Sequence, residues 1–92
     1  IIIDPGFGFG KTIDHNFEIL SNLGKFKDFK KPLLAGISRK SMIYKFLNTG
    51  PSKALNGTSI LNTIALNNGA DMLRVHDIIE AKECLALFNK LN

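Results

Sequence analysis

Three short clusters of functional side chains each follow a run of apolar residues. The first, residues 4–11, reads DPGFGFGK; the second, residues 38–41, reads SRKS; the third, residues 74–77, reads RVHD. Asp4 comes directly after three isoleucines. In a mostly apolar pocket, such a carboxylate can accept two parallel N–H bonds from a planar heterocycle that carries an amino group beside a ring N–H. Asp4 could equally be a turn former before Pro5, and its context favours binding.

The second cluster contains a lysine whose positive charge must be compensated by an anion or a hydrogen-bond acceptor. Lys40 is predicted in the first turn of a helix, where a positive charge opposes the helix dipole. A surface lysine is the ordinary interpretation of such a residue, but a bound anion or acceptor would also compensate the charge. Ser41 and the free N–H groups beside it form a natural site for a carboxylate or a phosphate.

Arg74 lies inside an apolar run and is the residue hardest to explain as purely structural. A buried arginine at this position would need an acidic partner. Because side chains alternate along a strand, Arg74 and His76 point to the same side. Together they are typical of a clamp for phosphate or pyrophosphate. His15 has no such neighbours, and we predict a solvated residue in the first turn of a helix.

The glycines of the first cluster resemble two nucleotide-binding motifs and match neither. They are spaced by two residues, so the third glycine of a dinucleotide fingerprint would fall on Lys11. A Walker A loop would need a glycine at Pro5, which has no N–H to give a phosphate. We expect the glycines to turn the backbone sharply and to expose Phe7 and Phe9; burial of both rings in the core is the alternative.

Three strands alternate with helices in the order βαβαβα. The runs 1–3, 33–37 and 72–75 are apolar without alternation, which indicates strands buried on both faces of a parallel sheet. Their starts lie roughly 30 to 40 residues apart, as βαβ units require. A TIM barrel uses about 31 residues for each of its eight units, so the chain is predicted to supply about three of them. A doubly wound sheet is the alternative, and in both folds ligands bind at the carboxyl ends of the strands.

Four helices are predicted between and after these strands. The first runs from about Asp14, its N-cap, to a stop at Gly24; the second is short and capped by a serine of the second cluster. The third ends at Gly69, and Asp77 with Glu80 has the spacing of a capping box for the fourth. The expected buried residues are Phe17, Ile19, Leu20 and Leu23 in the first helix, Met42, Ile43, Phe46 and Leu47 in the second, Ile60, Leu61, Ile64 and Ala65 in the third, and Ile78, Ala81, Leu85 and Phe88 in the fourth.

Composition limits the class of protein. The 92 residues are 45% hydrophobic and 22% charged, which fits at most one globular domain. The sequence starts on a strand, so we expect residues 1–92 to be a fragment of a domain. The net charge of +4 is spread out and does not predict nucleic-acid binding. No apolar run approaches the roughly 20 residues that cross a bilayer, so we expect no membrane partner and a cytoplasmic location. Cys84 is predicted to be a buried helix thiol.

The three clusters, in this order and spacing, resemble the last three strand ends of dihydropteroate synthase. The resemblance covers essentially all 92 residues. It implies that residues 1–92 are the C-terminal portion of a pterin-binding TIM barrel. It also implies an enzyme that joins p-aminobenzoate to 6-hydroxymethyl-7,8-dihydropterin pyrophosphate, and that releases pyrophosphate in folate biosynthesis.

The resemblance also implies a role for each strand-end residue. Asp4 and Lys40 would bind the pterin and take part in catalysis. Phe9, Ser41 and Arg39 would bind p-aminobenzoate, with Arg39 near the entrance of its site. The third cluster has two such residues: Arg74 would pack against the pterin and, with His76, bind pyrophosphate.

Further implications concern cofactor and partners. Mg²⁺ would assist the leaving group, with its ligand in an N-terminal part outside these residues and no metal ligand within them. Sulfonamide inhibitors would compete with p-aminobenzoate, and the intact enzyme would be a homodimer. Pyrophosphate would leave first, and the aromatic amine would then capture the pterin-methyl cation. Because other pocket residues belong to earlier strands, the fragment alone is expected to be inactive.

Two other functions remain open at this point. A pterin-binding methyltetrahydrofolate methyltransferase domain would share the aspartate but release no pyrophosphate. A non-catalytic anion-binding barrel segment would keep the cations without turnover.

Overall fold

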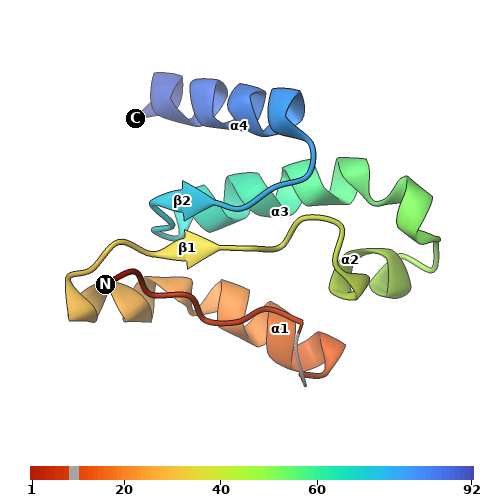
Figure 1. The fold of residues 1–92 in the computed structure, drawn as a ribbon, viewed down its shortest axis with the longest axis horizontal. Helices are drawn as coiled ribbons and strands as arrows, with labels where there is room; N and C mark the ends of the chain where they lie inside the picture. Colours follow the sequence, from red (N-terminus) through yellow and green to blue (C-terminus); the bar gives the residue numbers. More distant parts are fainter. Residues whose placement is uncertain (9–10) are drawn as a thin grey trace.

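The computed structural model describes residues 1–8 and 11–92 and places two parallel strands among helices (Figure 1). The strands are β1 (Leu34–Ala35) and β2 (Met72–Leu73). The strand pair lies between α1 on one side and α4 on the other, with α3 behind it (Figure 1). The α-helices are α1 (Ile13–Ser21), α2 (Ser41–Phe46), α3 (Leu55–Asn67) and α4 (Ile78–Leu91), and the 3-10 helices are η1 (Leu23–Phe29) and η2 (Pro51–Lys53).

The sheet is parallel, as the unbroken apolar runs predict. Leu34 pairs with Met72, and Ala35 pairs with Leu73. The first predicted strand is present as one parallel bridge between Ile3 and Leu33. There the Ile3 carbonyl accepts the Leu34 N–H at 2.8 Å. All three predicted strands therefore lie side by side with β1 in the middle, and each is shorter than expected.

The first connection differs from the prediction at both ends. Thr12, and not Asp14, is the N-cap of α1, and its hydroxyl accepts the His15 N–H at 3.1 Å. Gly24 is not the stop of the first helix, because α1 already ends at Ser21 and Gly24 lies within η1. The C-cap of η1 is Lys30, in a left-handed conformation with φ 54°. His15 is exposed in the first turn, as predicted.

The N-caps of the other helices correct two further predictions. Lys40 is the N-cap of α2 and not a residue of its first turn, and no serine side chain caps this helix. Asp77 is the N-cap of α4, but its carboxylate makes no capping hydrogen bond, so the predicted capping box with Glu80 does not form. The end of α3 is as predicted, with Gly69 at φ 110°.

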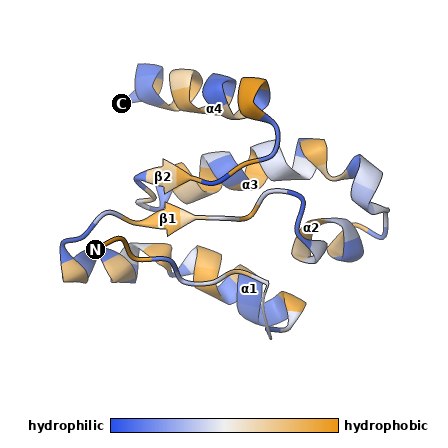
Figure 2. Cartoon of the chain, in the orientation of Figure 1, coloured by the Kyte–Doolittle hydropathy of each residue, from blue (hydrophilic) through white to orange (hydrophobic). Residues whose placement is uncertain are grey.

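The core lies where the helices cover the strands, and the strands are hydrophobic along their length (Figure 2). Leu33, Ala35 and Ile37 have no exposed surface. Several predicted core residues are instead exposed, which corrects the prediction for parts of three helices; they are Phe46, Leu47, Ile60, Ile64 and Ile78.

An open, mostly apolar groove between α3 and α4 explains part of this exposure. Ile60 and Ile64 line it from α3, and Leu87 lines it from α4. Cys84 also lines the groove and is buried, as predicted, with its thiol 3.5 Å from the Ser59 carbonyl oxygen. Within residues 1–8 and 11–92, no helix has the length and apolar character needed to cross a bilayer.

Candidate functional site

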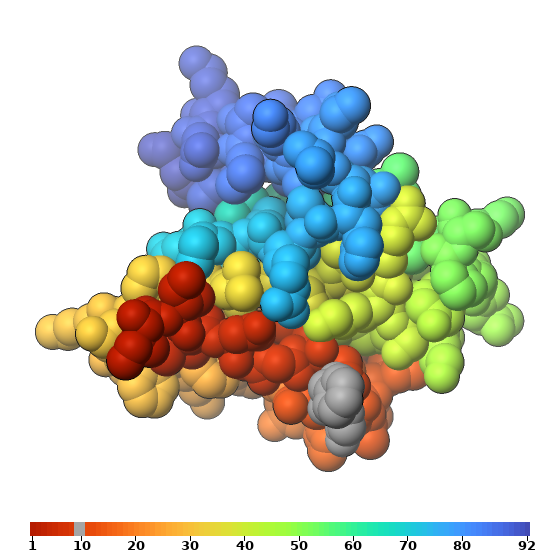
Figure 3. All heavy atoms as spheres, viewed as in Figure 1, coloured from red at the N-terminus to blue at the C-terminus, as the bar shows by residue number. Residues whose placement is uncertain are grey.

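The structure brings the ends of the three strands together on one side of the sheet. The chain after β2 lies against the N-terminal segment and against the chain after β1, as the space-filling view shows (Figure 3). The parallel pairing is the cause, because parallel strands end at the same edge of a sheet. The three clusters predicted from the sequence therefore form one surface.

Asp4 uses its carboxylate in two ways. One oxygen, Oδ1, accepts the Gly6 N–H at 2.9 Å, which is the turn-forming role. The other, Oδ2, lies 3.7 Å from Nη2 of Arg74. The carboxylate is thus fixed by the turn, while its second oxygen faces a cation across the strand ends. The turn-forming interpretation of Asp4 is confirmed, and the ligand-binding interpretation stays a prediction.

Lys40 reaches from the N-cap of α2 to the glycine loop. Its Nζ donates to the carbonyl oxygen of Phe7, and its aliphatic stem passes close to Gly8, where an added Cβ would lie 3.2 Å from Cδ. Burial, followed by the nearby charge of Arg74, lowers the pKa of Lys40, while Asp4 opposes this shift. Desolvation disfavours the charged form, so the ammonium is held where a further acceptor would stabilise it.

Arg74 lies over Gly36 of the chain after β1. A Cβ added to Gly36 would be 2.8 Å from Nη2, 3.2 Å from Nε and 3.3 Å from Cζ of the guanidinium. The side chain is 63% exposed, and no buried acidic partner holds it among the described residues, so the purely structural interpretation of this arginine is not supported. Its acidic neighbour, Asp4, is at the surface of the same site. One face of the guanidinium rests on the backbone, and much of the group stays open to solvent.

His76 contacts Ser38, which lies two residues after Gly36 in the chain that follows β1. Its Nδ1 lies 2.9 Å from Oγ of Ser38, and its backbone N–H donates to the same oxygen at 3.2 Å. Gly36 and Ser38 are two residues apart, and each meets one of the two predicted clamp residues. This agrees with the expectation that Arg74 and His76 share one side of the strand.

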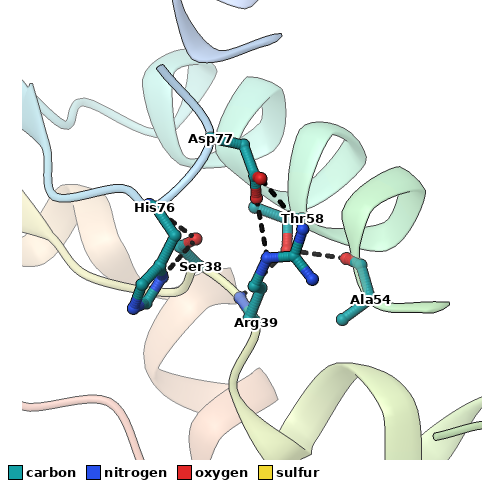
Figure 4. Close-up of polar contacts among 6 residues, drawn as sticks. All are labelled: Ser38, Arg39, Ala54, Thr58, His76 and Asp77. Carbon is teal, nitrogen blue, oxygen red and sulfur yellow. Dashed lines mark hydrogen bonds and ion pairs between the residues drawn. The ribbon is translucent and has the colours of Figure 1, made fainter. Parts of the chain in front are cut away.

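Arg39 is engaged in a bidentate ion pair with Asp77 (Figure 4). Nε and Nη2 each donate to one carboxylate oxygen at 2.9 Å. The hydrogen bond from Arg39 lowers the pKa of the Asp77 carboxyl, and the same contact raises the pKa of Arg39. Its backbone N–H donates to Oγ1 of Thr58 at 3.0 Å. The guanidinium therefore connects the end of β1 to the start of α4.

The glycine loop turns as predicted but does not expose Phe7. Gly6 and Gly8 have φ angles of 76° and 91°. Phe7 is 2% exposed and belongs to the core, so the alternative interpretation is correct for this ring. Phe9, predicted to contact p-aminobenzoate, lies outside the described residues.

Sequence reasoning missed two buried polar residues that hold these loops. Asn16 of α1 accepts the Gly8 N–H at 2.7 Å through its side-chain oxygen. Thr58 of α3 accepts the Arg39 N–H and donates to the Ala54 carbonyl at 2.7 Å. Both are 2% exposed. A polar residue on the apolar side of a helix is the signal that could have identified them.

Ser41 is the first residue of α2 and follows directly on Lys40. It is partly buried, at the point where the helix leaves the strand ends. Among residues 1–8 and 11–92, no three His, Cys, Asp or Glu side chains come close enough to hold a metal ion.

The chain is similar in sequence to known pterin enzymes. The family model described as "Pterin binding enzyme" matches residues 1–76. Dihydropteroate synthase of Escherichia coli (strain K12) is 48% identical over 85 residues, which are 92% of this chain and 30% of that protein. The bifunctional dihydropteroate synthase/dihydropteroate reductase of Helicobacter pylori is 45% identical over 91 residues, 99% of this chain and 24% of that protein. The chain spans less than a third of the length of these two relatives.

Solved structures agree in fold. Dihydropteroate synthase of Yersinia pestis aligns with a TM-score of 0.94 and 40% identity over 98% of this chain and 37% of that chain. The enzyme of Coxiella burnetii, solved in complex with pteroic acid, aligns with a TM-score of 0.93 and 38% identity over 99% of this chain and 35% of that chain. These proteins are TIM barrels, and the predicted fold of about three strand-helix units is confirmed.

Proposed function

The chain belongs to the pterin-binding enzyme family, and from this we propose that it forms the C-terminal part of a dihydropteroate synthase. In this proposal residues 1–92 supply the last three units of a TIM barrel. "The complete enzyme" below means the protein in which these residues are joined to the remaining units. The reaction joins p-aminobenzoate to 6-hydroxymethyl-7,8-dihydropterin pyrophosphate and releases pyrophosphate.

The observation that carries the proposal is the meeting of Asp4, Lys40 and Arg74 at the strand ends. Oδ2 of Asp4 lies 3.7 Å from Nη2 of Arg74. The charges of both residues influence the pKa of Lys40. A flat, amino-bearing heterocycle fits such a set, since the carboxylate accepts its N–H groups, the ammonium donates to an oxygen or ring nitrogen, and the guanidinium lies against its ring. Only together do the three groups specify a pterin.

The second substrate would bind beside Lys40. Ser41 at the start of α2 would help to hold the carboxylate of p-aminobenzoate, and Phe9 would shape its pocket. We assign Arg39 to the entrance of this pocket, where Nε and Nη2 pair with Asp77 and Nη1, which is not part of that ion pair, would face p-aminobenzoate. Sulfonamides would compete here, and the Yersinia pestis relative has been solved with a sulfonamide drug.

Arg74 and His76 would hold the departing pyrophosphate. Departure of an anion before attack by the amine leaves positive charge on the pterin methylene group, and the carboxylate of Asp4 would stabilise that charge. The guanidinium would balance charge on the leaving group at the same time. We expect a Mg²⁺ ion to bind pyrophosphate through ligands on other units of the barrel. The nitrogen of p-aminobenzoate then forms a bond to the methylene carbon, and the protonated amine that results gives one proton to water.

A turnover assay of the complete enzyme tests this function. Asp4→Asn should lower dihydropteroate formation by about 100-fold or more, because it removes the negative charge that would stabilise the pterin-methyl cation. His15→Asn is the matched control, since His15 is exposed in α1, and it should change nothing. A complete enzyme that forms no dihydropteroate from the two substrates would disprove the assignment.

Two further measurements separate this proposal from its alternatives. Pyrophosphate plus a pterin should raise the melting temperature of the complete enzyme; no response to pyrophosphate would favour a methyltransferase. Residues 1–92 alone should give no turnover, since they lack most of the barrel of the relatives. The homodimer and the cytoplasmic location implied by the resemblance are parts of the same proposal.

A further inference from the structure

We propose that Thr58 and Asp77 are positioning residues that fix the turn carrying Lys40 and Ser41. This inference rests on the proposed function and goes beyond it, because neither residue is assigned to contact a substrate. The two residues come from different helices, α3 and the N-cap of α4. Both make hydrogen bonds with Arg39, Thr58 with its backbone and Asp77 with its side chain (Figure 4).

The turn needs support because its backbone is strained. Arg39 has a φ of 55°, in the left-handed region. For a residue with a Cβ that region is unfavourable, and such residues persist where the surrounding contacts over-determine them. The next residue, Lys40, returns to an extended conformation with φ −74° and ψ 157°. The change at Arg39 thus sets the direction in which Lys40 leaves the strand.

Thr58 fixes the backbone of the turn. Its hydroxyl accepts the Arg39 N–H at 3.0 Å and donates to the Ala54 carbonyl at 2.7 Å, which orients its lone pairs toward Arg39. The residue is 2% exposed. The Ala54 carbonyl also accepts the Thr58 N–H at 2.9 Å. Removal of the hydroxyl therefore leaves Ala54 with a partner, and the Arg39 N–H is the group that loses one.

Asp77 fixes the side chain of the same residue. As the N-cap of α4 its carboxylate could bond the free N–H groups of that helix, but it makes no such bond and instead takes both guanidinium hydrogen bonds from Arg39. A fork-to-fork pair defines orientation as well as distance. With backbone and side chain both held, Arg39 has little freedom to leave the left-handed conformation.

The consequence is a site that is assembled before substrate binds. If the turn relaxes, Lys40 and Ser41 leave their places together. The apparent affinity for substrate is then the intrinsic affinity multiplied by the fraction of molecules that keep the turn. Substrate binds to molecules in which the turn is formed, and in that complex the positions of the groups that contact the reacting atoms are unchanged. The loss should therefore appear in KM and not in kcat.

The test compares Thr58→Val, Thr58→Ser and Thr63→Val in the complete enzyme. Thr63→Val is the matched control, because its hydroxyl also bonds the carbonyl four residues earlier, Ser59, but lies exposed on α3. We expect Thr58→Val to raise KM for both substrates about fivefold, the effect of one hydrogen bond. The value of kcat should stay within about twofold. Thr58→Ser should restore KM, and the control should not change it.

Asp77→Asn gives a second, independent arm, and should also raise KM for both substrates with kcat retained. Hydrogen exchange at the Arg39 amide reads the turn without any substrate, and should accelerate in Thr58→Val. An inactive unsubstituted enzyme would overturn the proposed function, while the exchange measurement would still decide the turn. An active enzyme in which Thr58→Val leaves KM and Arg39 exchange unchanged, or in which Thr58→Ser and Thr63→Val shift KM as much, would overturn this inference alone.

Discussion

The substitution Gly36→Ala would displace the guanidinium of Arg74 without replacing any charged residue. The added methyl group would lie 2.8 Å from Nη2 and 3.2 Å from Nε. Atoms this close to a Cβ cannot remain in place, so the guanidinium must move away from the strand. Gly36 is not among the described glycines with a positive φ, so its φ does not exclude alanine.

The cost should appear in ligand binding and not in stability. The Arg74 side chain is 63% exposed, so it can swing into solvent without opening the core. The free energy of unfolding should change by less than about 1 kcal/mol, since an alanine at a compatible position also restricts the unfolded chain. Loss of a hydrogen bond to a charged group costs about 1.5 to 3 kcal/mol. That range corresponds to roughly a 10-fold to 150-fold loss of affinity.

Titration calorimetry on the complete enzyme with pterin pyrophosphate would measure this loss. Gly50→Ala is the matched control, because a Cβ at that position would meet no described atom within 4 Å. Gly36→Ala should weaken binding by about 10-fold or more, and the control should bind as the unsubstituted enzyme does. Equal affinity of the three proteins would show that the position of Arg74 over Gly36 does not matter for binding, and the assignment of this guanidinium to the pterin would fail.

Three further predictions concern stability of the complete enzyme, followed by chemical denaturation. Gly57→Ala should destabilise by about 1 to 3 kcal/mol through overpacking, because its Cβ would collide with Ile43 in the core; an unchanged midpoint would contradict this. Asn62→Leu should stabilise by about 1 kcal/mol, because the buried side-chain oxygen of Asn62 has no partner among the described residues; a loss of stability would mean that the amide is needed. The pKa of Asp77 is lowered from its ordinary value of 3.8 by Arg39, so its contribution to stability is present above pH 3.8 and is lost as pH falls through the lower, folded value. Asp77→Asn should therefore flatten the acid limb of the stability curve, and an identical slope in both proteins would refute the assignment.

The sequence was sufficient for the architecture and for the meeting of the three clusters that form the candidate site. Unbroken apolar runs before the residues 4–11, 38–41 and 74–77 predict parallel strands, and parallel strands bring their ends together. That alone places Asp4, Lys40 and Arg74 near one another. The fold class and the family followed from the same three clusters and are confirmed.

Contacts between loops could not be predicted in this way. Asp77 has the spacing of a capping box, yet its carboxylate turns to Arg39, which is 38 residues earlier in the chain. Local pattern rules compare neighbours along the chain and cannot see a competing partner from another unit. Phe7 was misplaced for a related reason, since two glycines predict a turn but not the side to which the ring between them points.

The residues that shape the site differ from the residues that would do its chemistry. Asp4, Lys40 and Arg74 can be identified by type, because charge in an apolar setting needs an explanation. Gly36 offers room for a guanidinium, and Thr58 supplies one hydrogen bond to a strained turn, but neither type indicates chemistry. A substitution at Gly36 or Thr58 can thus cost as much binding as the loss of one contact to substrate. The geometry of such a site depends on residues such as these, whose role can be recognised only from their contacts with a neighbouring strand-helix unit.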